Sequence, residues 1–440
     1  MKKTLIKLLV IGTLGLVSSS ELAGQTSPYT FGSLGLMKSK GFVQHDLMGG
    51  ISSNMISAND YSMVNPASLS HIEHTNLQTG SFLSFIDQQS ATKRNNNRDG
   101  DFGYFSLGLP LSVKKKVGFG ASLNRFTALD YSIPGSGIEN GESVTNLFAG
   151  KGGLSQFTTS FGGQLVDGLS FGVGASFIFG SIEEIVEKQF PESQDVFSVR
   201  NTSATFYSGV KYNFGVQYSR QFKKGRQVVV GGHFSPSVSL ETSQTQLVQT
   251  YNYQGEFFVD TLVERADVSA AQEIPTQFGG SLSYGKKEVW SLGLEYNVAQ
   301  WSSIIPRGND NMYFDQTSIA VGGFWQVKEE MNSQHSSKAE KFADYLKVSR
   351  IYYGFRTESL YTGVVNKKVD QMVFTLGVGL PLTRTYSIEG EKSRLTSRIN
   401  IGLEYTVRGN TDPGMIQENI LGIKFGLTLT DKWFIKRKYQ

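Results

Sequence analysis

The residues whose types and spacing come closest to a catalytic pattern are Gly168, Ser170 and Gly172, which match the G-x-S-x-G sequence of serine hydrolases. In those enzymes the serine lies on a sharp turn from a strand into a helix, which exposes its hydroxyl. Here the apolar alternation continues through Phe179, so the chain stays in a strand. We therefore expect no nucleophile at Ser170 and no enzyme. A surface hydrolase is the enzymatic alternative, and Ser170→Ala would then abolish ester hydrolysis.

Two other patterns resemble ligand sites but lack partners. His71 and His74 could present two imidazoles to a metal ion, yet no third ligand follows at a recognised spacing. Gly118 and Gly120 lie within a strand pattern and do not open a helix, as a phosphate-binding loop must. The chain has no cysteine, which excludes disulfides and thiolate ligands. We expect neither a metal nor a cofactor.

The elements that must position these residues are β-strands. Between Leu169 and Gly180, large apolar residues alternate with serine and glycine. Successive side chains of a strand point to opposite faces, so one face suits lipid and the other a polar lumen. The polar face is rich in glycine and poor in charge, unlike the solvated face of a soluble β-sandwich.

About fourteen segments between Leu77 and Asp431 repeat this pattern. We place them at 77–87, 101–111, 115–126, 153–165, 167–181, 202–221, 226–243, 274–285, 288–300, 313–327, 347–362, 369–382, 393–408 and 417–431. The sequence therefore predicts an all-β fold, a 14-stranded antiparallel transmembrane β-barrel over residues 77–440. A secreted soluble β-protein is the alternative.

The connections predict the topology. Short turns alternate with the longer stretches 127–152, 182–201 and 244–273, which we expect to be extracellular loops. Both termini are then periplasmic. Residues 328–346 are long for a periplasmic turn, and the apolar spacing predicts a short amphipathic helix near 336–347. That helix would either close the barrel's underside or form a docking surface.

The N-terminus predicts the compartment. Residues 1–24 combine lysines, an apolar stretch and a small-residue cleavage site, which is typical of a secretory signal peptide, with a mature start at Gln25. No later stretch has the roughly 20 apolar residues that a membrane helix needs. We expect the bacterial outer membrane, with contacts to its lipid and lipopolysaccharide. A net charge of +4 without a basic stripe does not indicate nucleic-acid binding.

Residues 25–76 precede the first strand and form a domain of their own in our prediction. They are punctuated by glycines and yet rich in leucine, methionine and phenylalanine, which a solvated linker would not be. A barrel of about fourteen strands leaves a lumen that must be filled. We expect this stretch to lie inside the barrel as a hatch.

Within residues 25–76, the stretch from Ser57 to Asp60 leads into Asn65, Pro66 and Ala67 just before the first strand. With Gly49-Gly50, the signal peptide and the strand count, this resembles the FadL-like family of outer-membrane hydrophobic-compound transporters (FadL/TodX type). The chain's ends resemble outer-membrane proteins of the Bacteroidetes type. The resemblance implies that Asn65, Pro66 and Ala67 form the end of a hatch.

The resemblance also implies a function. The chain would be a channel for passive uptake of small hydrophobic compounds, such as long-chain fatty acids or hydrocarbons, with lateral release through the wall. Apolar residues in the expected loops would capture the ligand. These residues are Phe190, Phe197, Tyr251, Phe257 and Phe258. They could equally pack on each other and cap the barrel.

Charges at inward-facing positions depart from the family pattern. They are Lys211, Glu295, Arg350, Arg356, Glu404 and Lys424. Such a mixture could form an ion-paired network that holds the barrel shut. The alternative function is therefore a non-transporting accessory barrel subunit of an outer-membrane assembly or secretion machine, with an outer-membrane or periplasmic protein partner.

Overall fold

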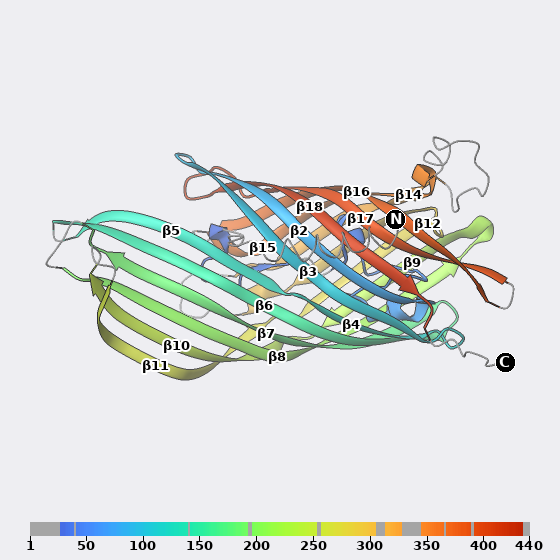
Figure 1. The fold of residues 1–440 in the computed structure, drawn as a ribbon, viewed down its shortest axis with the longest axis horizontal. Coiled ribbons are helices and arrows are strands. Elements are labelled where there is room, and N and C mark those ends of the chain that lie inside the picture. Colours follow the sequence, from blue (N-terminus) through green and yellow to red (C-terminus); the bar gives the residue numbers. More distant parts are fainter. Residues whose placement is uncertain are drawn as a thin grey trace.

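The computed structural model describes residues 27–38, 41–139, 141–191, 196–252, 257–304, 313–327, 345–364, 367–388 and 391–433. Within these residues the chain forms a closed antiparallel β-barrel (Figure 1). Each strand pairs with the next along the chain, and the last pairs with the first. The described residues contain no helix long and apolar enough to cross a membrane, a finding that has no bearing on β-barrels.

The described residues form fourteen barrel strands, as the sequence predicts, and three of these strands are each interrupted once. The interrupted ones are β4 (Val117–Arg125) with β5 (Thr127–Glu139), β9 (Arg226–Ser235) with β10 (Val238–Asn252), and β11 (Phe257–Ile274) with β12 (Gln277–Lys286). The others are β2 (Thr75–Gln89), β3 (Arg94–Ser112), β6 (Glu142–Val166), β7 (Leu169–Gln189), β8 (Ser198–Gln221), β13 (Trp290–Ala299), β14 (Gln316–Gln326), β15 (Arg350–Val364), β16 (Lys367–Ile388), β17 (Glu391–Arg408) and β18 (Gln417–Asp431).

The two faces of the wall differ as the alternation predicts. On β7, Phe171 and Phe177 face outward and are 45% and 47% exposed, whereas Ser170 and Ser176 face inward and are at most 1% exposed. A ring of exposed apolar side chains is what a bilayer requires of a barrel's outer surface.

The barrel has two different ends. We call the end where β2 begins and β18 ends the proximal end, and the opposite one the distal end. Proximal turns are short, such as the one between Val166 and Leu169. In the proximal connection from β14 to β15, residues 345–348 form a helical turn. The rest of the helix predicted near 336–347 lies outside the described residues, as does the predicted signal peptide.

The prediction of long distal loops is wrong, because most of those residues continue the hairpins. β5 and β6 remain paired up to Glu139 and Glu142. β7 runs to Gln189, β8 starts at Ser198, and β10 and β11 fill most of the third expected loop. These strands form a wall that rises past the rest of the distal end (Figure 1). A bilayer takes only about 9–11 residues of a strand, so the wall extends well beyond it.

Candidate functional site

The N-terminal segment, residues 27–38 and 41–74, packs against inward-facing side chains of the barrel. It holds η1 (Pro28–Thr30), β1 (Leu36–Met37), α2 (Val43–Asp46) and η2 (Pro66–His71). Phe42, Val43 and Leu47 are fully buried although they belong to no regular sheet. The segment therefore fills part of the barrel's interior, and its contacts with the wall are the candidate site.

The helix η2 packs against a row of four glycines in the barrel wall. Gly118, Gly162, Gly172 and Gly215 are direct partners across β4, β6, β7 and β8. A Cβ atom at Gly162 would lie 2.2 Å from the carbonyl oxygen of Pro66, and one at Gly118 would lie 2.2 Å from that of Leu69. Only glycine leaves room for the helix backbone this close to the wall.

Asn65 fixes the start of η2. Its Oδ1 accepts a hydrogen bond from the backbone N–H of Ala67 at 3.1 Å, which caps the helix. Its Nδ2 donates to the carbonyl oxygens of Ser53 at 2.7 Å and Val216 at 3.0 Å. Pro66 supplies the first helical residue, where no backbone donor is needed. The fully buried Asn65 thus joins two parts of the segment to β8.

An ion-paired lysine holds α2. The Nζ of Lys424 on β18 lies 3.0 Å from Asp46 and 2.8 Å from Glu404 on β17. The phenol of Tyr104 accepts a hydrogen bond from the N–H of Val43 at 3.0 Å. Asp46 is 1% exposed, so this ion pair lies in the interior of the barrel.

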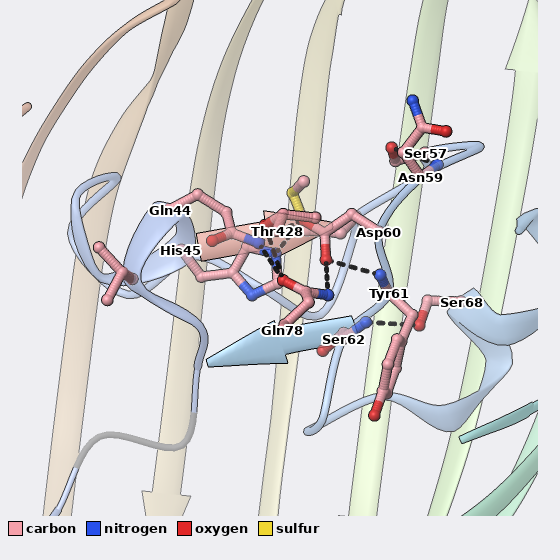
Figure 2. A network of polar contacts seen from close by, with 12 residues as sticks. Gln44, His45, Ser57, Asn59, Asp60, Tyr61, Ser62, Ser68, Gln78 and Thr428 are labelled. Carbon is pink, nitrogen blue, oxygen red and sulfur yellow. Dashed lines mark hydrogen bonds and ion pairs between the residues drawn. The ribbon is translucent and has the colours of Figure 1, made fainter. Parts of the chain in front are cut away.

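A second polar network centres on Asp60 (Figure 2). Its carboxylate accepts hydrogen bonds from Gln44 at 2.7 Å, Gln78 at 2.8 Å and the N–H of Tyr61 at 2.8 Å. The ring of His45 lies 3.5 Å away. Burial raises the pKa of Asp60, but the neighbouring His45 ring and the side-chain hydrogen bonds from Gln44 and Gln78 outweigh it, so the pKa lies below its ordinary value.

Glu295 and Arg356, two of the predicted inward charges, reach the backbone of the segment. Glu295 accepts hydrogen bonds from the N–H groups of Ser52 at 2.8 Å and Ser53 at 3.0 Å. Arg356 donates to the carbonyl of Gly49 at 3.4 Å and pairs with Glu358. Both contacts would be broken if the segment left the wall.

The remaining predicted inward charges, Lys211 and Arg350, bind neighbours within the wall. Lys211 donates to Gln277 at 3.3 Å and lies over the ring of Phe126. Arg350 pairs with Glu288 at 2.6 Å, in the turn from β12 to β13. In the described part of the chain, the predicted charges thus contact the segment and their strand neighbours.

A cavity of about 240 Å³ lies between the segment and the wall. Its charged lining residues include Lys38, Asp99, Asp101, Arg125, Glu295, Arg356 and Glu404, and its apolar lining residues include Phe82, Phe278, Val373 and Ile423. Towards the distal end lies an apolar cluster around Trp301 and Tyr361, whose rings stack at 4.2 Å. Towards the proximal end lies another around Phe42 and Tyr352. The cavity thus has a mixed lining, with charges of both signs beside apolar side chains.

The wall has a seam between β3 and β5. The pairing of β3 with β4 ends at Tyr104 and Asn124, and β5 pairs on that side with the segment's β1. Asp99 and Asp101 on β3 both lie 3.6 Å from Lys38. The segment therefore covers the seam.

The five expected capture residues do not form one group of loops. Phe190 follows β7, and Phe197 precedes β8 and is 48% exposed. Tyr251 lies within β10, buried beneath the guanidinium of Arg200. Phe257 and Phe258 begin β11, and their side chains lie outside the described part. The expectation that all five belong to loops is wrong for the last three.

Ser170, His71 and His74 were the residues considered first for catalysis or metal binding, and the structure shows the surroundings of each. Ser170 accepts a hydrogen bond from Ser70 of η2 at 2.8 Å. Burial, with Lys116 and Lys287 nearby, lowers the pKa of His71 to about 4. His74 contacts Asn59 at 2.8 Å. Over the ranges described, no group of three or more His, Asp or Glu side chains is placed to hold a metal ion.

Sequence reasoning missed Asp46, Asp60 and Lys38. Asp46 and Asp60 stand in an apolar stretch, and a carboxylate there must find a partner when it is buried. That signal was available in the sequence. The identity of the partners was not, because Lys424 and Gln78 approach only through the closed barrel.

Comparison with known proteins gives one family and one fold. A protein-family model described as BamG matches residues 1–440. No curated protein matches the chain. The chain is similar in structure to a Pseudomonas aeruginosa FadL homologue (14% identity, TM-score 0.58, covering 91% of this chain and 100% of that one). It is also similar to the toluene transporters TbuX of Ralstonia pickettii (13%, 0.55, 89% and 99%) and TodX of Pseudomonas putida (12%, 0.54, 94% and 100%).

Proposed function

We propose, from the premise that this chain belongs to the BamG family over its whole length, that it is a closed, non-enzymatic barrel of the bacterial outer membrane. In this proposal it does not transport. It serves as an accessory subunit of an outer-membrane assembly or secretion machine, with the N-terminal segment as a permanent plug.

The single observation that carries this proposal is the pairing of Lys424 with Asp46. Breaking a buried ion pair is costly, but Lys424 would keep Glu404, so we expect a cost below the roughly 3–5 kcal/mol of a pair whose remaining charge is left uncompensated. A plug that moved in each transport cycle would meet that cost, and would also free the carboxylate of Glu295 and the amide of Asn65.

A second candidate is a channel for small hydrophobic compounds, fatty acids or hydrocarbons, with lateral release. Two observations favour it: the shared fold with the two toluene transporters, and the seam between β3 and β5. In this reading Phe190, Phe197, Tyr251, Phe257 and Phe258 capture the ligand. Asn65, Pro66 and Ala67 anchor a movable hatch, and β1 leaves the seam to release the ligand.

Mild detergent extraction of the tagged protein from its own host separates the two candidates. We expect outer-membrane or periplasmic proteins to co-purify at fixed stoichiometry, because a subunit is held by its assembly. We also expect a strain that lacks the protein to take up a fluorescent fatty acid at the normal rate. Extraction of the barrel alone, together with uptake that falls in the deletion strain and returns on complementation, would favour the channel.

A further inference from the structure

The distal wall ends in two strand edges. One edge is β5. Among the described residues it pairs with β6 on one side, and on the other side only Thr127 and Ala128 pair, with β1. β11 is the other, because its residues 257–268 pair, within the described strands, with β10 alone. In Figure 1, β11 forms the margin of the wall below β10. An edge strand presents unpaired N–H and C=O groups that another chain can use.

The two edges differ in how they are protected against pairing. Residues 131–139 of β5 include Pro134, which lacks a donor, and Gly135 and Gly137, which weaken a strand. Residues 257–268 of β11 contain neither proline nor glycine, but they carry four charged residues and pair with β10 through three register shifts. Charges and bulges also discourage pairing, so the β11 edge suits a partner strand of opposite charge and not a second copy of itself.

The β11 edge lies beyond the apolar band of the barrel. On β10, residues 244–251 pair in turn with residues 198–205 of β8, distal to the outward-facing Phe206 and Val210. Apolar side chains are nevertheless exposed along the edge: Val259 is 46%, Leu262 56% and Val268 48% exposed. Exposed apolar side chains along a strand edge form a surface that a partner would cover.

The charge along this edge indicates the partner's chemistry. Residues 257–268 carry three carboxyl groups and one guanidinium, a net charge of −2 by difference, in a chain of net charge +4. The attraction of a basic strand to this edge would therefore be local, and would run against the overall charge of the barrel.

We propose that residues 257–268 of β11 accept an extended strand, with basic side chains, from a partner protein. Main-chain hydrogen bonds would supply the affinity, and alternate side chains would contact Val259, Leu262 and the carboxylates of Asp260 and Glu264. This inference rests on the proposed function, since a surface for a partner's strand has a use only in a barrel that works in an assembly.

Peptide binding to the purified full-length barrel in detergent micelles tests the inference. The probe is a fluorescent ten-residue peptide of alternating valine and lysine, followed by anisotropy. We expect saturable binding that falls at least tenfold when alternate peptide nitrogens are methylated, because the donors to the edge are lost. We expect a similar fall in Asp260→Lys/Glu264→Lys, and none in the matched Glu139→Lys/Glu142→Lys variant at the β5–β6 tip.

Circular dichroism establishes that each variant retains its strands. Equal binding of the methylated peptide, or equal loss in both double variants, would overturn the inference. Failure of the proposed function is distinguishable. If the barrel binds the peptide but is extracted without partner proteins, the β11 site is supported and the subunit role is contradicted. If the barrel is extracted with partner proteins but does not bind the peptide, the subunit role is supported and the β11 site is contradicted.

Discussion

Asn65 shows how one side chain couples the two halves of the structure. Its amide caps η2 through Ala67 and holds Ser53 of the segment and Val216 of the wall. The sequence motif around Asn65 predicts a hatch end, and proline after asparagine predicts a helix start. It does not predict Val216, because β8 is about 150 residues away along the chain and meets Asn65 only in the closed barrel.

Replacing Asn65 by alanine should loosen η2. The cap contributes about 1 kcal/mol, and the carbonyl groups of Ser53 and Val216 would each also lose a donor. We expect amide hydrogen exchange at Ala67 to Ser70 to accelerate at least tenfold while exchange in β7 stays unchanged. The matched control is Asn410→Ala, since Asn410 also accepts from the N–H two residues on, but in an exposed turn. Equal acceleration at both turns would contradict the anchoring role.

At the scale of elements, the barrel wall is shaped to its plug. The inward face of β7 is predictable from the alternation, and Gly118 and Gly172 are predictable as lumen positions. Why glycine is needed there is not predictable, because the reason is the backbone of η2 against four adjacent strands. Small inward residues are compatible both with an open lumen and with a filled one, and the sequence pattern alone does not separate the two.

Neighbouring glycines of β6 offer a matched test. Gly162→Ala would place a Cβ atom 2.2 Å from the carbonyl oxygen of Pro66, whereas Gly163→Ala would meet only Val117, at 3.7 Å. Overpacking against backbone costs typically about 1–3 kcal/mol. We expect limited proteolysis to cut residues 41–74 faster in Gly162→Ala and at the normal rate in Gly163→Ala. Equal protection in both variants would show that η2 does not need the glycine row.

At the scale of the whole molecule, the barrel reaches far beyond a bilayer on one side. The strand pattern predicts the fourteen strands because lipid imposes an apolar outer face on them. It fails for the distal parts of β6, β7 and β8, because they extend past the bilayer and lipid imposes no strict alternation on them there. The same absence of constraint explains why the residues expected in capture loops lie partly in strands.

The closed state also depends on the whole molecule, because β1 covers the seam that the break between β4 and β5 creates. Leu36 and Ala128 are direct partners there. Paired residues of antiparallel strands lie about 4.5–5.5 Å apart, within the range for a disulfide. The chain has no cysteine of its own, so Leu36→Cys with Ala128→Cys would lock the seam selectively.

Uptake of a fluorescent fatty acid by cells carrying this locked barrel tests the central claim most directly. If the segment is a permanent plug, uptake stays at the level of cells lacking the protein, in both the oxidised and the reduced state. The same holds for the control pair Leu376→Cys with Leu403→Cys, partners on the outer face of β16 and β17. Uptake in the reduced Leu36–Ala128 barrel that ceases on oxidation, with no such change in the control, would contradict a permanently closed barrel.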